Sequence, residues 1–354
     1  MSPQMKNTRP ASQGQPPRRK KRRRRRRTPW WKTALLILLT VVFLVIAGSA
    51  AFVLGKLHMI RYDDGRTVPD QTTEADWPEE DPAADISGLP MVEANPVPAG
   101  ETAKNDKVLN VLLLGTDFPY NSNDPGRADA IMILTLDFRD NSARLTSLER
   151  GMGMPILSGK YAGQWDWYTH LYHYGGADMM LESLRYCFKV DVEKFAQVDF
   201  EAFKGVVNAL GGIDIELTDA EAARLKLKTG WNHLDGAAAL SYARLRSIDS
   251  DWVRITRQRR VIQACVDRIR DSDLATLNKL ADAVLPMIST NFTTTELLSL
   301  MTKAPKFMGV KFRQMTIPVQ GSYGGMMVMG GRGAFAADFE ENGRILKEFI
   351  YENK

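Results

Sequence analysis

The chain has 354 residues, of which 44% are hydrophobic, and carries a net charge of +5 at pH 7. That length suffices for one large domain or two small ones with hydrophobic cores. The positive charge is confined to one end, because the first 55 residues carry thirteen basic side chains and no acidic one, which leaves −8 for the remainder. The balance therefore does not indicate a nucleic-acid-binding domain.

The N-terminal segment reads as a membrane anchor. Residues 1–32 are rich in Pro, Gln and Arg and predict a basic cytoplasmic tail. Residues 33–55 contain no charge and no proline, and as a helix rising about 1.5 Å per residue they span roughly 34 Å, enough for the ~30 Å hydrocarbon layer. A cleaved signal peptide is the alternative, although its apolar region is usually only about 7 to 15 residues.

Ten consecutive basic residues, 18–27, lie just before this span. Taken alone they could bind nucleic acid. Beside a membrane span they are better explained as a topology signal that keeps the N-terminus cytoplasmic and contacts anionic lipid head groups. We therefore expect a single-pass cell-membrane protein that contacts membrane lipid through its anchor, binds no nucleic acid and exposes everything after Lys56 outside the cytoplasm.

Residues 56–106 are acidic and Pro-rich and predict an extracytoplasmic spacer, followed by a folded domain at 107–354. The apolar run ending in GTD predicts a strand buried on both faces, and Asp140-Asn141 predicts a hairpin turn between two further strands. The expected strands are 107–117, 128–138, 142–150, 195–199, 213–217 and 311–318, and the expected helices are 177–189, 200–209, 233–246, 252–270, 274–284, 295–303 and 338–351. Such alternation predicts an α/β sandwich around a mixed sheet.

Two features leave alternatives open. Residues 151–176 predict a long loop whose aromatic side chains either stack on sugar rings or seal the edge of the domain. Cys187 and Cys265 could form a disulfide outside the cytoplasm or remain two buried thiols. Neither cysteine nor any of the four histidines has metal-ligand spacing, so zinc chemistry is not indicated.

Arginines and carboxylates suggest a phosphate site. Between Leu240 and Gln258 the chain carries Arg244, Arg246, Arg254 and Arg257, together with Asp249 and Asp251. Guanidinium groups grip phosphate oxygens through a planar fork of donors. GTD at 115–117 and GRAD at 126–129 supply carboxylates around apolar strands. The combination suggests a metal-bound phosphate, with a solvated basic helix face as the alternative.

Seven sequence blocks follow one another along the chain: VLLLGTD, GRADAIMILTLD, TSLER, HYGG, FKGVVNALGGIDIEL, LDGAAALSYARLR and RITRQR. In order and approximate spacing they resemble the LytR-CpsA-Psr family of cell-wall proteins. The similarity covers about residues 107–270, and STNFTTTELLSL extends it more loosely. The resemblance implies an α/β sandwich with a central mixed β-sheet that encloses an apolar lipid tunnel.

The resemblance also implies an extracytoplasmic phosphotransferase that moves a glycopolymer, of teichoic acid or capsule type, from undecaprenyl pyrophosphate to peptidoglycan. Mg²⁺ is the implied cofactor, since it prefers hard oxygen ligands and bridges phosphates. The metal-side carboxylates are matched by Asp117 and Asp129, and the pyrophosphate-binding residues by Arg127, Arg150, Arg244, Arg246, Arg257 and Gln258. The implied catalytic set is Asp129, Arg150, Arg244, Arg246 and Asp251, with either Asp129 or Asp251 as general base.

Individual residues also have local structural explanations: Asp117 could cap a loop, Arg150 could pair at a strand end, and Asp251 could cap the helix that follows it. The sequence departs from the family at 148–152, where Glu149 precedes Arg150 and Gly151 replaces the usual Asp, and at 118–120, where an arginine is missing. A non-catalytic polyprenyl-phosphate-binding or regulatory envelope protein is therefore the second hypothesis. Transcriptional regulation conflicts with the predicted topology.

Overall fold

The core of the domain is a seven-stranded mixed sheet. The computed structural model describes residues 51–63, 86–93, 96–117, 126–245, 248, 251–307 and 310–352, and residues from Val53 onward form one unit. The sheet order is β1-β10-β7-β2-β3-β4-β11. The strands are β1 (Arg61–Tyr62), β2 (Val108–Thr116), β3 (Ala128–Asp137), β4 (Ser142–Leu148), β7 (Lys194–Asp199), β10 (Ser289–Thr290) and β11 (Arg313–Ile317). Antiparallel pairing of β2 with β3 and parallel pairing of β2 with β7 confirm the predicted mixed sheet.

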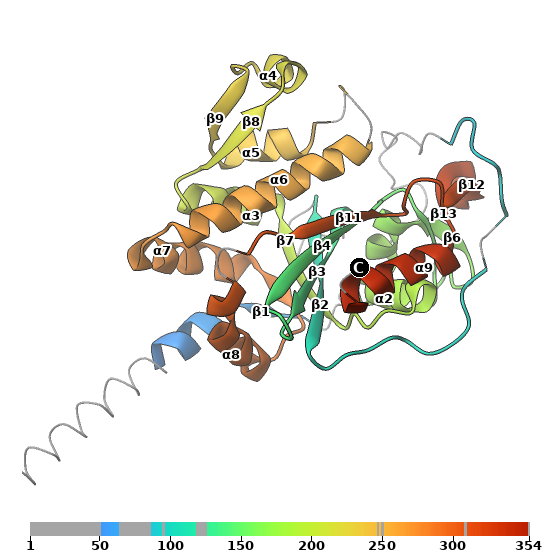
Figure 1. Cartoon of the computed structure of the whole chain (residues 1–354), viewed down its shortest axis with the longest axis horizontal. Helices are drawn as coiled ribbons and strands as arrows, with labels where there is room; N and C mark the ends of the chain where they lie inside the picture. The colour runs from blue at the N-terminus through green and yellow to red at the C-terminus, as the bar shows by residue number, and fades with distance from the viewer. Residues whose placement is uncertain are drawn as a thin grey trace, which may run out of the picture. The chain divides into compact units, whose positions relative to one another are not determined.

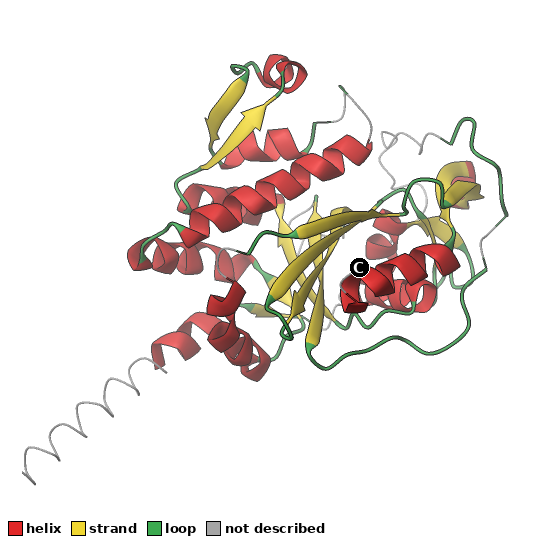
Figure 2. Cartoon of the chain, in the orientation of Figure 1, coloured by secondary structure: helices red, strands yellow, loops and turns green. Residues whose placement is uncertain are grey.

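Helices cover both faces of this sheet (Figures 1 and 2). On one face lie α2 (Tyr168–Phe188) and α9 (Phe339–Lys347), the latter followed by a π-helical turn (Glu348–Glu352). On the other lie α3 (Phe200–Ala209), α5 (Gly236–Ala243) and α6 (Asp251–Arg270), with α7 (Leu274–Val284) and α8 (Thr294–Lys303) beyond them. Short 3₁₀ turns occupy Leu285–Met287, Ala304–Phe307 and Met329–Gly331. The predicted α/β sandwich is confirmed.

Side-chain alternation along the central strands separates the two layers. Leu112, Ile131 and Ile133 join the cluster formed with α2 and α9, whereas Leu113 and Met132 line a cavity on the opposite face. Successive residues of a strand point to opposite faces, so one strand serves both layers. The two faces thus differ in packing: the face covered by α2 and α9 is filled with side chains, and the opposite face borders a cavity.

Three two-stranded sheets lie outside the central one. They pair β5 (Gly153–Pro155) with β6 (Trp165–Trp167), β8 (Ile213–Leu217) with β9 (Gly230–Leu234), and β12 (Tyr323–Val328) with β13 (Arg332–Ala337). The strand expected at 213–217 is therefore present but does not join the central sheet, because among the described residues its partner is β9. The helix α4 (Asp219–Leu225) connects β8 to β9 and begins with a capping box at Thr218.

The expected loop at 151–176 is partly wrong. Residues 153–155 and 165–167 are short strands, and the part from Tyr168 onward is helical, because α2 begins there and continues past Gly176, whose φ of 63° produces a kink. Trp167 and Tyr168 are 1% and 0% exposed. These two side chains therefore fill the core, whereas for the partly buried Trp165 and Tyr174 both interpretations stay open.

The two thiols have a clear outcome, as does the start of α5. Asp235 accepts a hydrogen bond of 2.8 Å from the amide of Ala238 and so caps the N-terminus of α5. Both cysteines are free thiols: Cys187 is buried in the layer of α2, and Cys265 packs on the other side of the sheet. Burial raises the pKa of the Cys265 thiol to about 12. A disulfide between them is excluded.

The N-terminal predictions fall mostly outside the described residues. Within the described part, no helix combines the length and apolar character that a bilayer crossing needs. The tail at 1–32 and most of the span at 33–55 lie outside it, while residues 51–57 are helical. Parts of the predicted spacer contact the domain, since β1 pairs with β10 and Ala103 bridges Val190.

Asp137, at the end of β3, forms ion pairs whose contribution to the stability of the domain can be measured. It is fully buried and accepts bonds from Arg139 (2.6 Å) and Arg144 (3.3 Å). Burial raises its pKa, but the hydrogen bonds from Arg139 outweigh that effect, and the pKa is lowered. We expect Asp137→Asn to reduce the free energy of unfolding by about 3 kcal/mol at pH 7, because it leaves buried guanidinium charge uncompensated.

Urea denaturation at several pH values measures this. A lowered folded-state pKa contributes stability above the unfolded pKa of about 4 and loses it as the pH falls through the folded value. The difference between wild type and variant should therefore shrink below about pH 4. The exposed Glu340→Gln substitution is the control, with an expected change below about 0.5 kcal/mol. A pH-independent difference would contradict this account.

Candidate functional site

An apolar cavity lies between the sheet and the helices of the second layer. Its volume is about 290 Å³. Its walls come from β2, β3, β7, α3, α5 and α6: Leu113, Leu114, Gly115, Ala130, Met132, Ala196, Val198, Phe200, Phe203, Leu240, Ala243, Val261, Ile262 and Ile288. Polar side chains line the cavity as well: Asp129, Asp199, Arg244, Arg254 and Gln258. A ligand that fills it must join an apolar part to an anionic or polar part.

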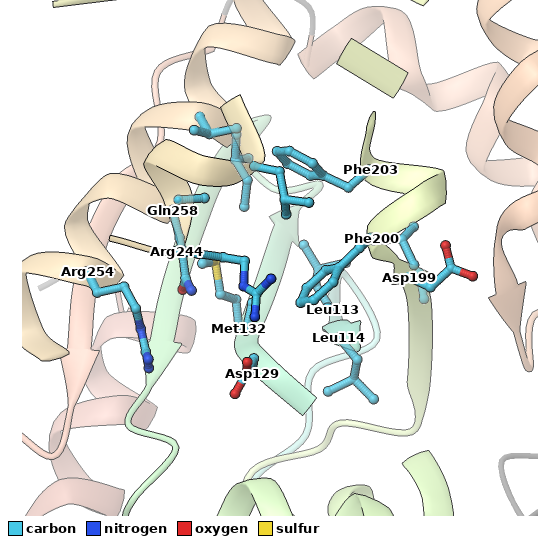
Figure 3. A pocket seen from close by; sticks show the side chains of 18 of the residues that line it. Leu113, Leu114, Asp129, Met132, Asp199, Phe200, Phe203, Arg244, Arg254 and Gln258 are labelled. Atoms are coloured by element: carbon cyan, nitrogen blue, oxygen red, sulfur yellow. The ribbon is translucent and has the colours of Figure 1, made fainter. Parts of the chain in front are cut away.

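Figure 3 shows how the polar residues meet. Arg244 directly follows α5, and its guanidinium carbon lies 4.4 Å from the centre of the Phe200 ring, above Asp129. Arg254 and Gln258 are one helical turn apart on α6 and face the same space. Asp199 points away from Arg244 and caps α3 through the amide of Ala202. Arginine donors and one carboxylate therefore meet where the apolar wall ends.

Two acid–arginine pairs surround the start of β3. Arg150, 5% exposed, donates to Asp129 over 3.0 Å. Arg127 donates to Asp117 through its backbone amide (2.7 Å) and its guanidinium (3.3 Å). Burial raises the pKa of Asp117, and the charge of the neighbouring Asp129 raises it further. The structure thus brings together four of the residues predicted from sequence.

The remaining predicted residues have other outcomes. Arg257 is 1% exposed and donates to Glu221 (2.8 Å) and to the carbonyl of Leu245 (2.9 Å), away from the cavity lining. Its role as a phosphate ligand stays a prediction. Arg246 lies outside the described residues, and of Asp251 the structure describes the backbone, which begins α6.

Sequence reasoning left Arg254 out of the site, although it lines the cavity. Helical periodicity could have found it, because residues 254, 258, 261 and 262 share one face of α6 while 257 lies on the neighbouring face. Once Gln258 is assigned to the site, Arg254 follows from the i, i+4 spacing. The four arginines of this segment are therefore not equivalent.

Sequence reasoning also missed a second set of residues, which fixes the N-terminus of α2. Thr169 donates to the carbonyl of Ala128 (2.8 Å), and its amide donates to the carbonyl of Arg150 (3.1 Å), so α2 begins against the two acid–arginine pairs. Next to it, the buried Asp166 accepts bonds from Tyr174 (2.7 Å) and Arg332 (3.2 Å). These contacts fix the backbone of Ala128 and Arg150, whose neighbours form the site.

The departure at Glu149 has a local explanation. Its side chain is fully buried, and one carboxylate oxygen accepts the amide of Gly151 over 3.3 Å. The amide of Met152 donates to the Glu149 carbonyl, which completes a turn after β4. Glu149 therefore helps to shape the turn that carries Arg150.

The residues present fit a magnesium ion that bridges phosphates. Among the described residues, no group of three or more acidic, histidine or cysteine side chains is arranged so that it could hold a metal ion by itself. Asp117 and Asp129 are close enough for one carboxylate to shift the pKa of the other. Mg²⁺ commonly takes one or two protein carboxylates and fills its other positions with phosphate oxygens and water. The pair could therefore hold Mg²⁺ together with a phosphorylated ligand.

Comparison with known proteins identifies relatives. Residues 73–345 match the model of the LytR_cpsA_psr family. TagV of Bacillus subtilis (strain 168), a polyisoprenyl-teichoic acid–peptidoglycan teichoic acid transferase, is 30% identical over 222 residues, which is 60% of this chain and 56% of TagV. The match thus spans about half the length of that relative.

Solved structures show the same fold. The crystal structure of B. subtilis TagV has a TM-score of 0.56 and 25% identity, and the match covers 70% of this chain and 98% of that one. The structure of TagT bound to LIIa-WTA has a TM-score of 0.56 and 24% identity, and the match covers 70% and 91%. At this level of identity the likeness to TagT supports the fold alone.

The two kinds of arginine can be separated by experiment. We expect Arg257→Ala to reduce the free energy of unfolding by about 3 to 5 kcal/mol, because it leaves the buried carboxylate of Glu221 without its partner. Arg244 is exposed and stacks on one ring, so Arg244→Ala should cost at most about 1 kcal/mol. Urea denaturation of both variants measures the difference. Equal losses of stability would show that the two arginines are not distinct in this way.

Proposed function

We propose, from the premise that this chain belongs to the LytR-CpsA-Psr family, that it is a membrane-anchored extracytoplasmic phosphotransferase. Its donor is a teichoic-acid-type or capsule-type glycopolymer on undecaprenyl pyrophosphate, and its acceptor is peptidoglycan. The observation that carries the proposal is the junction in Figure 3, where Arg244, Arg254 and Asp129 meet the wall of an apolar cavity. The names of TagV and related transferases support the same activity.

The cavity suits the lipid portion of such a donor. Moving an apolar chain out of water stabilises a complex by about 0.8 kcal/mol per CH₂ group. The anionic diphosphate next to the tail needs compensating charge, which Arg244 and Arg254 supply at the polar end. The tail thereby places the diphosphate in register with the arginines.

The reaction is a substitution at phosphorus. A hydroxyl oxygen of the acceptor forms a bond to the phosphorus that carries the polymer, the bond to the bridging oxygen breaks, and polyprenyl monophosphate leaves with the electron pair. Negative charge grows on the nonbridging and leaving oxygens, so positioned guanidinium groups lower the barrier. Arg244, held over Phe200, and Arg254 are placed to do this.

The proton of the acceptor hydroxyl needs a base. Asp129 lines the cavity and is held by Arg150 over 3.0 Å. Asp251 begins α6, the helix that also carries Arg254 and Gln258. Both remain candidates. When bound by Asp117 and Asp129, Mg²⁺ would neutralise charge on the phosphate oxygens.

A second function has one observation in its favour. The turn that carries Arg150 departs from the family pattern, with the buried Glu149 before it and Gly151 after it. An altered neighbourhood of Arg150 is consistent with a protein that holds polyprenyl phosphate without turnover. Native mass spectrometry of the purified full chain separates the two: a bound lipid with no transfer under any metal condition would favour binding alone.

The activity test uses Arg244. The full chain, reconstituted in vesicles with the lipid-linked donor and peptidoglycan, should attach polymer to the wall material. We expect Arg244→Ala to lower kcat by roughly 10²-fold to 10³-fold, as for loss of one oxyanion donor. Arg244→Lys should restore only part, because it keeps the charge and loses the fork. Equally poor transfer by wild type and Arg244→Ala would remove the enzymatic assignment, whereas equally efficient transfer would remove the catalytic role of Arg244.

The metal requirement is tested at the carboxylate pair. Chelation should abolish transfer and Mg²⁺ should restore it, with Asp117→Asn raising the Mg²⁺ concentration for half-maximal rate about tenfold or more. Because the pKa of Asp117 is raised, the metal competes with a proton as the pH falls, so the Mg²⁺ requirement of wild type should increase at acid pH. Full activity of the wild type in excess chelator would show that these carboxylates act in another way.

A further inference from the structure

A second hollow lies on the outer side of α5. Its volume is about 530 Å³, and it is lined by α4, the segment after it and α5: Arg224, Leu225, Leu227, Ala238, Ser241, Arg244 and Leu245. Arg244 also lines the apolar cavity. The two hollows therefore meet at the side chain that the proposed reaction places on the diphosphate.

The periodicity of α5 explains this arrangement. Leu240 and Ala243 face the apolar cavity, while Ala238 and Ser241 face the outer hollow. Residues three apart share one face of a helix, so α5 forms a wall between the two spaces. Arg244 follows directly after its last residue and borders both. A molecule whose diphosphate lies at Arg244 can continue past the end of α5 into the outer hollow.

The segment beside the outer hollow is basic. Residues 224–231 read RLKLKTGW: Arg224, Leu225 and Leu227 line the hollow, and the exposed Lys226 and Lys228 alternate with the two leucines along the chain. The acidic side chains of α4 are engaged elsewhere, because Glu221 is buried against Arg257 and Asp219 accepts a bond from Thr229. In a chain whose residues after 55 carry a net charge of −8, this is a local concentration of positive charge. It favours an anionic ligand.

The neighbouring surface has the opposite character. A hollow of about 760 Å³ between β8 and α6 is lined by four carboxylates and two arginines: Asp214, Glu216, Asp267, Asp271, Arg260 and Arg268. A polyanion is repelled from that side of the β8–β9 hairpin and attracted to the side of Lys226 and Lys228. An anionic polymer is therefore expected to pass on the side of Lys226 and Lys228 and not along the hollow between β8 and α6.

We propose that the outer hollow, together with the exposed Lys226 and Lys228 that adjoin its lining residues in sequence, is a binding subsite for the phosphodiester-linked polymer of the donor. This rests on the proposed function and adds to it the path of the polymer beyond the diphosphate. The lysines neutralise phosphate groups of the polymer. Leu225 and the 41% exposed Leu227 lie between the basic residues and contact its carbon skeleton. The subsite binds substrate and takes no part in bond making.

The test compares two donors on the same lipid diphosphate. One carries a polymer of phosphodiester repeats, and the other carries a single uncharged disaccharide. For the full chain in vesicles, Lys226→Gln/Lys228→Gln should raise KM for the polymeric donor roughly threefold to tenfold, as expected for two exposed charge contacts. Its kcat, and both constants for the short donor, should not change. Added salt should raise the wild-type KM for the polymer and reduce the difference between the proteins.

The matched control removes two exposed lysines elsewhere. Lys279→Gln/Lys311→Gln changes the net charge equally, far from α4 in sequence, and should leave both donors unaffected. Thermal denaturation checks that each variant folds. An unchanged KM for the polymer in the Lys226/Lys228 variant, or an equal change for both donors, would overturn the subsite.

Failure of the proposed phosphotransferase function would give a different result from failure of the subsite. If the wild type transfers neither donor, the phosphotransferase assignment fails. The subsite is then judged by equilibrium binding of a lipid-free glycerol-phosphate oligomer to the full chain. Binding that weakens threefold or more in the Lys226/Lys228 variant, and not in the control, supports the subsite, whereas equal binding by all three proteins refutes it.

Discussion

The site depends on one physical constraint: charged side chains that lie next to an apolar cavity must be compensated for their loss of hydration. A carboxylate or guanidinium removed from water is stable only when an opposite charge or hydrogen bonds compensate the loss of hydration. The pair of Asp129 with Arg150, at 3.0 Å, provides that compensation next to a cavity lined by leucine, valine and phenylalanine side chains. Arg244 stays exposed to water and stacks on the face of Phe200. The buried charge of this site is therefore paired, and the exposed charge lies against an aromatic ring.

The central sheet makes the cavity and the site from the same strands. In β3, Ile131 and Ile133 fill the layer of α2 and α9, while Ala130 and Met132 leave space on the opposite face. Small residues matter here, because a Cβ added at Gly115 would lie 3.1 Å from that of Ala130. The charged residues follow directly at the strand ends. The same strands thus bring apolar lining residues and charged side chains to one cavity.

Hydrophobic periodicity predicted most strands and helices of the domain, because local burial repeats with the period of each element. It missed the first turns of α2, since the pair Gly175-Gly176 reads as the end of a loop, whereas packing carries the helix across a kink at Gly176. It also missed β12 (YGGMMV) and β13 (RGAFAA), which lack a clear alternation of apolar and polar residues. The formation of β12 and β13 depends on their pairing with each other and not on the local β-propensity of their sequences.

The sequence by itself determined which residue types meet: acids after apolar strands, and arginines after Ala-rich and within polar helices. Family spacing was enough to select Asp129, Arg244 and Gln258. Only the tertiary structure decided which arginines of one segment face the cavity, because Arg254 and Arg257 differ by a rotation about the helix axis. Both side chains are buried, but Arg257 packs against Glu221, whereas Arg254 lines the cavity. Contacts between residues far apart in the sequence decide which arginine faces the cavity, and local periodicity does not reveal such contacts.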